Sequence, residues 1–221
     1  MTVLIAVKFP GGAMLAADSR TTLPFAENGI LTDDAQKVHV IHGQAVAAFG
    51  VNVISDHARK LLEGMTMPQS GDEFLTFVGH SLSVAWIKLK PAFAADVVLD
   101  APAMRAGFLG AGLDAKGTYV GGCMSTIKGA DTPLLVRDDW QRIVLGAETF
   151  GSTQHLDDQV APLIASAIRA GLAPIEVGRQ AAEAAAVTIR AMSKLDKSVG
   201  GAIRFRIQLN TGESTQGTLP P

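Results

Sequence analysis

The sequence opens Met1-Thr2-Val3-Leu4-Ile5-Ala6-Val7-Lys8, turns at Pro10-Gly11-Gly12 and continues Ala13-Met14-Leu15-Ala16-Ala17-Asp18. Two apolar runs joined by a Pro-Gly turn predict two neighbouring strands, over residues 3–8 and 13–18. A threonine directly follows the initiator methionine, so removal of Met1 makes Thr2 the N-terminal residue.

An N-terminal threonine is a candidate nucleophile. Its hydroxyl and its own α-amine lie on one residue, and this pairing is one of the known ways of activating a hydroxyl. An α-amine has a pKa near ~8, so it can accept a proton at neutral pH, whereas an ordinary lysine cannot. The alternative is that Thr2 only leads into the first strand.

Composition limits the function classes. The chain has 221 residues, of which 48% are hydrophobic and 18% are charged, and its net charge is −2. The charged fraction is below the usual ~25%, which predicts an oligomer with a large buried interface. The weak negative charge argues against nucleic acid as a partner. Cys123 is the single cysteine, which excludes an internal disulfide and is typical of a reducing, cytoplasmic environment.

Neither a membrane helix nor a signal peptide is expected. No apolar run approaches the ~18 residues that a membrane helix needs. Residues 3–7 are apolar, but Lys8 and the glycine pair interrupt them and no basic segment precedes them. Thr2 is therefore expected to be the mature N-terminus, and membranes are not expected as partners.

The remaining elements alternate between runs of strands and pairs of helices. A helix cap is expected at Ser70 or Asp72, and Pro174 is expected at the first position of a helix. We predict strands over 38–41 and 45–49, helices over 52–65 and from the cap to about residue 89, several strands within 106–147, helices over 152–170 and from residue 174, and a strand over 202–209.

This order predicts one α+β domain over residues 1–209. Paired helices must cover both faces of a β layer, so the simplest packing is two mainly antiparallel sheets face to face with a helix pair outside each. The result is a four-layer αββα sandwich. Residues 210–221 are polar and rich in glycine, threonine and proline, which predicts a mobile C-terminal tail.

Four motifs, in order along the chain, carry a resemblance to a known family. They are Leu15-Ala16-Ala17-Asp18-Ser19-Arg20, Gln36-Lys37-Val38-His39-Val40-Ile41, Ala45-Val46-Ala47-Ala48-Phe49-Gly50 and Asp196-Lys197-Ser198-Val199-Gly200-Gly201. With the opening strand, they resemble the β-type subunits of the proteasome and the bacterial proteasome-like (HslV-type) threonine peptidases. Glu148-Thr149 is similar to the minor bacterial homologues of that family. The resemblance implies the N-terminal nucleophile hydrolase fold.

The resemblance also implies a catalytic set of Thr2, Asp18, Lys37 and Asp196. Thr2 supplies the attacking hydroxyl, and Lys37 as an ammonium favours its alkoxide. Asp18 pairs with Lys37 and keeps it charged. Asp196 supports Thr2 from a distance. The alternative for Asp18 and Lys37 is a surface ion pair, and for Asp196 a helix-end residue.

Supporting roles follow from the same resemblance. The backbone amide of Ala48 is the expected oxyanion donor, and the methyl group of Ala48 is expected to narrow the cleft. Thr149 and Ser198 are the expected supporting hydroxyls, although Ala147 and Val199 are alternatives at those positions. Thr21, Ala35 and Val46 are expected to form an uncharged substrate pocket. Residues 117–128, in a stretch longer than the family usually has, are expected to form an added hairpin or a lid.

The predicted function is a threonine-type endopeptidase that needs no cofactor or metal. His39 and His42 are three apart on a strand, which places them on opposite faces rather than in a metal site. The implied partners are other copies of this chain in a ring or stacked rings, unfolded polypeptide substrates and an ATP-dependent unfoldase. Two alternatives remain open: an inactive ring subunit that keeps Met1, and a small-molecule amidase.

Overall fold

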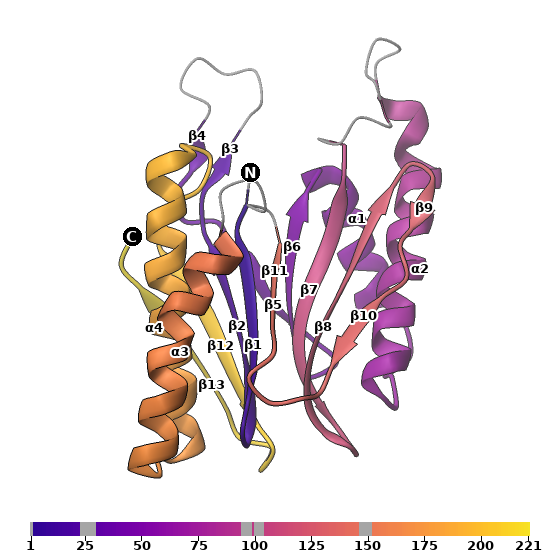
Figure 1. Cartoon of the computed structure of the whole chain (residues 1–221). Coiled ribbons are helices and arrows are strands. Elements are labelled where there is room, and N and C mark those ends of the chain that lie inside the picture. The colour runs from indigo at the N-terminus through magenta and orange to yellow at the C-terminus, as the bar shows by residue number, and fades with distance from the viewer. Residues whose placement is uncertain (1, 23–29, 94–98, 100–103, 146–151) are drawn as a thin grey trace.

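The structure is a computed structural model that describes residues 2–22, 30–93, 99, 104–145 and 152–221. It is a mixed α/β architecture in which two antiparallel sheets are flanked by helices, as Figure 1 shows. In these described segments, no helix combines the length and the apolar character needed to cross a bilayer.

The first sheet contains both ends of the described chain. Its strand order is β11-β1-β2-β12-β13, and each neighbouring pair is antiparallel. The strands are β1 (Leu4–Phe9), β2 (Gly12–Asp18), β11 (Arg142–Leu145), β12 (Ile203–Leu209) and β13 (Ser214–Leu219). The predicted N-terminal hairpin is confirmed, with Leu4 opposite Ala17 and Phe9 opposite Gly12.

The second sheet has the order β10-β8-β7-β6-β5, with β9 beside β8. Its strands are β5 (Val38–Ile41), β6 (Gln44–Gly50), β7 (Ala106–Asp114), β8 (Gly117–Thr126), β9 (Gly129–Ala130) and β10 (Leu134–Val136). A short antiparallel pair, β3 (Thr21–Thr22) and β4 (Ile30–Thr32), forms a separate two-stranded sheet.

Each sheet has its own helices. Helices α3 (Ser152–Ala170) and α4 (Pro174–Leu195) lie beside the first sheet, whereas α1 (Asn52–Glu63), α2 (Gly71–Leu89) and the short 3₁₀ helix η1 (Lys90–Ala92) lie beside the second. Three apolar clusters fill the spaces between these layers: one between α3/α4 and the first sheet, one between the sheets, and one between the second sheet and α1/α2.

The two helix-start signals in the sequence are confirmed. The Ser70 hydroxyl accepts a hydrogen bond from the Glu73 amide at 3.1 Å, so Ser70 rather than Asp72 caps α2. Pro174 is the first residue of α4, where its missing N–H removes no helical hydrogen bond.

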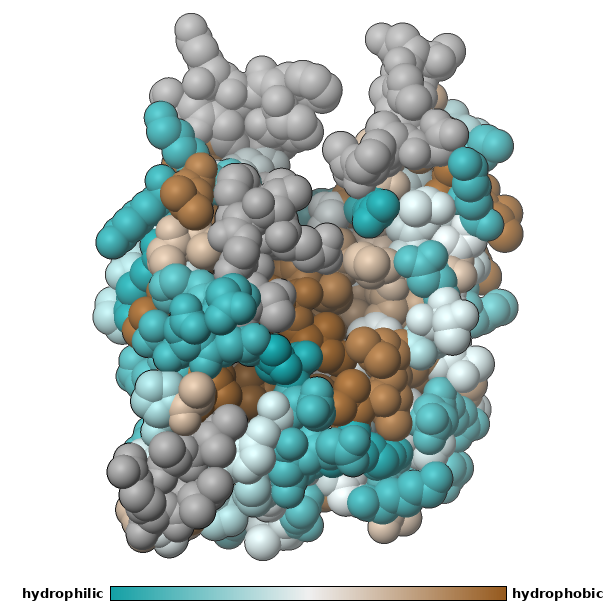
Figure 2. All heavy atoms as spheres, viewed as in Figure 1, coloured by the Kyte–Doolittle hydropathy of each residue, from teal (hydrophilic) through white to brown (hydrophobic). Residues whose placement is uncertain are grey.

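Apolar side chains also reach the surface. Figure 2 shows them gathered in a hollow near the centre of the face seen in Figure 1, with hydrophilic residues around them. Leu134 of β10 is among the exposed large apolar residues, and Ile87 of α2 is exposed on the outer helix layer.

The structure bears on two predictions about loops. Residues 117–128 do not form a lid, because β8 pairs with β7 from Ala106 opposite Ser125 to Asp114 opposite Gly117, and the two consecutive strands form a hairpin, which was the other alternative. The mobile tail predicted over 210–221 contains β13, which pairs with β12 from Ile203 opposite Leu219 to Gln208 opposite Ser214. Backbone pairing of this kind does not require an apolar sequence.

A substitution at Gly217 can test how the last strand, β13, packs. A Cβ at Gly217 would lie 2.5 Å from the Phe205 ring, so Gly217→Ala must displace that ring. We expect a loss of about 1–2 kcal/mol in the free energy of unfolding, measured by chemical denaturation. The exposed neighbour Thr218, changed to alanine, is the control and should cost at most about 0.5 kcal/mol. Equal effects of the two changes would contradict the packing described here.

Candidate active site

The N-terminal hairpin places Asp18 beside Thr2. Asp18 ends β2, and its amide donates to the carbonyl of Val3 at 3.4 Å. The Val3 amide in turn donates to Oδ1 of Asp18 at 3.0 Å. Because the strands are antiparallel, the end of β2 meets the start of β1, and the carboxylate lies next to the candidate nucleophile.

Lys37 reaches the same point from the second sheet. It directly precedes β5, and its Nζ lies 2.9 Å from Oγ1 of Thr2. The same nitrogen lies 3.1 Å from each carboxylate oxygen of Asp18 and also donates to the carbonyl of Arg20. The structure therefore brings together Thr2, Asp18 and Lys37, three of the four predicted catalytic residues.

Burial controls the electrostatics of this cluster. The Asp18 side chain is 0% exposed and that of Lys37 is 10% exposed. Burial raises the pKa of Asp18, and the Lys37 ammonium and the amides of Val3 and Gly200 act in the opposite direction. Burial lowers the pKa of Lys37, and the Asp18 carboxylate opposes this change. Lys37 is therefore closer to neutrality than a lysine in water.

Asp196 lies at the end of α4 and has a local role in this structure. Its Oδ1 accepts hydrogen bonds from the amide of Ser198 at 2.8 Å and from the Ser198 hydroxyl at 2.6 Å. Within the described residues, Asp196 makes no hydrogen bond to Thr2. Val199, the alternative to Ser198, is buried in the cluster beneath α3 and α4. Thr149 and its alternative Ala147 lie outside the described residues.

Of the predicted oxyanion and pocket residues, Ala48 and Val46 lie on one face of the second sheet, whereas Thr21 and Ala35 lie outside that sheet. Ala48 lies on β6 and is half-buried against the α1/α2 cluster, and the expectation that its methyl group narrows a cleft stays a prediction. Val46 is 1% exposed and belongs to the same cluster, so it does not line an open pocket here. Thr21 and Ala35 are half-buried.

The structure also brings residues to the site whose contacts the sequence did not indicate. The amide of Gly200 donates to Oδ2 of Asp18 at 3.3 Å. Arg20 forms an ion pair with Asp33. An arginine next to the terminal aspartate of a strand indicates a charged partner, but nothing in the sequence identifies which one.

Comparison with known proteins establishes the fold class. The sequence matches no protein-family model and no curated protein. The solved structure of an Anbu (Gly-1) mutant from Hyphomicrobium sp. strain MC1 is similar, with a TM-score of 0.68 and 17% identity over 100% of this chain and 87% of that chain. The structure of Anbu (ancestral beta-subunit) from Yersinia bercovieri is also similar, with a TM-score of 0.65 and 14% identity. The match covers 99% of this chain and 86% of that chain. At these identities the likeness shows a shared fold.

The comparison corrects the resemblance drawn from the sequence. The assignment to proteasome β-type subunits or HslV-type peptidases was wrong, because the similar structures are Anbu proteins, one of them described as an ancestral β-subunit. The motifs around Thr2, Asp18 and Lys37 lie at strand ends where the fold itself brings them together. Such motifs therefore indicate the fold more firmly than a particular branch.

Removing one partner of the buried Asp18–Lys37 pair should make the stability of the protein depend on pH. In Lys37→Met, Asp18 stays buried without its cation, so its pKa rises further above the unfolded value. The variant should lose about 3–5 kcal/mol of stability at about pH 8, as expected when one partner of a buried pair is removed. The loss should be smaller at about pH 5, because Asp18 of the folded variant is then protonated and carries no buried charge. The stability of the variant should fall as the pH rises through the raised pKa of Asp18.

Chemical denaturation at the two pH values provides the measurement. The double variant Lys37→Met with Asp18→Asn is the control, since a neutral amide has no charge to desolvate. Its stability should change no more with pH than that of the unaltered protein. An equal loss at both pH values in Lys37→Met would show that Asp18 does not depend on Lys37.

Proposed function

We propose that this chain is a proteasome-like threonine-type endopeptidase subunit, and that its sheets and helices form the four-layer αββα sandwich of an N-terminal nucleophile hydrolase. In this proposal Thr2 attacks peptide bonds after Met1 has been removed. The observation that carries the proposal is the buried contact of Lys37 Nζ with Oγ1 of Thr2 at 2.9 Å and with both Asp18 oxygens at 3.1 Å. The fold shared with Anbu proteins supports it.

In the first step, Oγ1 of Thr2 attacks the peptide carbonyl carbon and its proton passes to the free α-amine of the same residue. A lysine ammonium has three N–H donors. Those of Lys37 face Asp18, the Arg20 carbonyl and Thr2 Oγ1, so one donor is directed at the oxygen that develops negative charge. This arrangement stabilises the alkoxide without a metal or cofactor.

The register of the β5–β6 hairpin supports Ala48 as the oxyanion donor. His42 and Gly43 have positive φ angles of 50° and 79°, as in the two-residue turns whose flanking residues exchange hydrogen bonds. In an antiparallel pair every second residue pair is hydrogen-bonded, so Ile41–Gln44 and His39–Val46 are hydrogen-bonded pairs. The next such pair would be Lys37–Ala48, but the pairing of the two strands ends one step earlier, at Val38–Ala47. The Ala48 N–H is thus directed at the open end beside Lys37, where it can donate to an oxyanion.

The tetrahedral intermediate collapses when the leaving amine takes the proton from the α-amine, and the acyl group remains on Thr2 as an ester. Water then attacks the ester, with the same α-amine as the base, and Thr2 is regenerated. Thr21 and Ala35 carry no charge, so the substrate side chain beside them should be apolar, because a buried ionic group would have no partner.

Activity should require both removal of Met1 and the Thr2 hydroxyl. Intact mass spectrometry measures loss of the methionine, and release from fluorogenic peptides measures hydrolysis. Thr2→Ala should abolish turnover because it deletes the nucleophile, whereas Thr2→Ser should retain some. Full turnover by Thr2→Ala would overturn the proposal. Retention of Met1 in an inactive but assembled protein would favour the inactive-subunit alternative, and cleavage of small amides without peptides would favour the amidase.

We also infer that the chain self-associates into a ring or stacked rings in the cytoplasm, takes unfolded polypeptides and works with an ATP-dependent unfoldase. The low charged fraction and exposed apolar residues such as Leu134 and Ile87 support the self-association. Contiguous apolar surface on a soluble protein marks an interaction site more often than a solvated face.

Self-association can be measured by multi-angle light scattering at micromolar concentration. We expect a single assembly many times the 23.0 kDa mass of one chain. Leu134→Glu and Ile87→Glu, made separately, place a charge on the two candidate surfaces, and the change that lowers the mass identifies the interface. A monodisperse monomer of the unaltered protein would refute the inference.

A further inference from the structure

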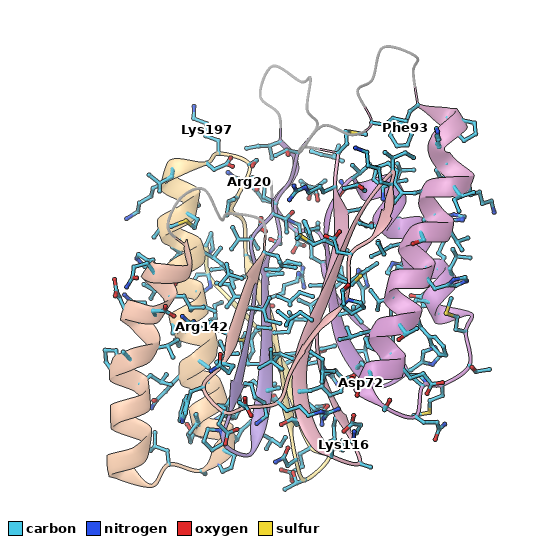
Figure 3. All side chains as sticks on the ribbon, turned by 45° about the vertical axis from the view of Figure 1, so that its right-hand side comes forward. Arg20, Asp72, Phe93, Lys116, Arg142 and Lys197 are labelled. Carbon is cyan, nitrogen blue, oxygen red and sulfur yellow. The ribbon has the colours of Figure 1, made fainter. Side chains whose placement is uncertain are left out.

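Arg20 joins two segments that are far apart in the sequence. Figure 3 shows Arg20 near Lys197 at the same end of the molecule. The guanidinium donates to both carboxylate oxygens of Asp33 through Nε and Nη2. Its Nη1 donates to the carbonyls of Lys197, at 2.8 Å, and Val199, at 3.4 Å. Four hydrogen bonds from one side chain therefore hold the segment before β5 against the turn before β12.

The backbone of Arg20 contacts the candidate site directly. Its carbonyl accepts a hydrogen bond from Nζ of Lys37, and its amide donates to the carbonyl of Gly200 at 2.8 Å. Gly200 is also the residue whose amide reaches Oδ2 of Asp18, at 3.3 Å. The side chain and backbone of Arg20 thus act on the same turn that helps to hold the Asp18 carboxylate.

The two glycines of this turn fit closely against the ion pair. Gly200 and Gly201 have φ angles of 152° and 72°, which favour glycine. A Cβ on Gly200 would lie 2.8 Å from Cζ of Arg20, and one on Gly201 would lie 2.2 Å from the carbonyl oxygen of Asp33. The Gly200-Gly201 pair is therefore required by contact with Arg20 and Asp33 as well as by its backbone conformation.

We propose that the Arg20–Asp33 ion pair positions the candidate site: it fixes the Gly200-Gly201 turn that hydrogen-bonds Asp18, and it holds the Arg20 carbonyl that binds Lys37. Arg20 and Asp33 are positioning residues, since neither side chain contacts Thr2. The proposal deepens the proposed function and rests on it for the statement that the positioned site is catalytic.

An ordinary surface ion pair would have little effect. Exposed pairs contribute about 0–1 kcal/mol because solvent screens them and long side chains lose freedom. Arg20 differs because its side chain is only 20% exposed, although that of Asp33 is 51% exposed. Its planar fork also makes bidentate and carbonyl contacts that a point charge would not reproduce.

The chain offers a matched control pair. Arg204 on β12 forms an ion pair with Asp34, the residue next to Asp33, and its side chain is about as exposed as that of Arg20. We compare Arg20→Gln and Asp33→Asn, singly and together, with Arg204→Gln and Asp34→Asn. All variants are made in the full chain with Met1 removed. Thermal unfolding verifies that each is folded, and Asp33→Asn, at the more exposed partner, is the variant to use if Arg20→Gln does not fold.

Two measurements separate positioning from general stability. The first is peptide hydrolysis: kcat for Arg20→Gln should fall about 100-fold with KM little changed, as expected for misplacement by about 1 Å. Asp33→Asn keeps one acceptor oxygen, so its kcat should fall only about tenfold. The kcat of the double variant should be no lower than that of Arg20→Gln, because both changes break the same hydrogen-bond network. The second is hydrogen exchange of the Gly200 amide by NMR, which should accelerate in Arg20→Gln and stay unchanged in the control variants.

The outcomes distinguish this proposal from the proposed function. If Arg20→Gln retains the kcat of Arg204→Gln, or if its Gly200 amide stays as protected as in the unaltered protein, the positioning role is overturned. If the unaltered protein with Thr2 exposed hydrolyses no peptide, the proposed function fails. Gly200 exchange then decides the positioning role by itself, because it does not depend on turnover.

Discussion

The structure depends on one buried carboxylate, that of Asp18, which must be satisfied without water. An ionised carboxylate in the interior is tolerated only when charge and hydrogen bonds compensate its lost hydration. Lys37 supplies the charge, and the amides of Val3 and Gly200 supply hydrogen bonds. These donors come from the start of β1, the segment before β5 and the turn before β12. The need to satisfy Asp18 therefore holds together the ends of both sheets.

The sequence could predict those elements whose signals are local. The N-terminal hairpin has a Pro-Gly turn between apolar runs, and α2 and α4 start at Ser70 and Pro174, as expected from capping and from proline geometry. The convergence of Thr2, Asp18 and Lys37 was expected only because the motifs that contain Asp18 and Lys37 resemble those of a known family. Residue type and position alone left a surface ion pair as an equal reading of Asp18 and Lys37.

Other features depend on contacts that no local pattern reveals. Strand β13 contains Ser214, Thr215 and Gln216 and lacks an apolar alternation, but its backbone completes the edge of β12 and Gly217 leaves room for Phe205. The burial of Val46 depends on helices α1 and α2, which cover one face of its strand. The pairing of Arg20 with Asp33 rather than with another acidic residue is a contact between two separate segments, which residue type alone does not specify.

The hydrogen bonds around Asp18 also explain how Lys37 can serve two partners. A carboxylate held by a cation alone would compete with Thr2 for every donor of that cation. Here two backbone amides already bind the Asp18 carboxylate, one oxygen each. Lys37 can therefore hold both oxygens from one position and still direct a donor at Oγ1 of Thr2. Backbone amides do not titrate, so their hydrogen bonds keep the Asp18 carboxylate in place at all relevant pH values. A donor of Lys37 can therefore interact with the negative charge that develops on Oγ1 of Thr2 while the carboxylate stays in position.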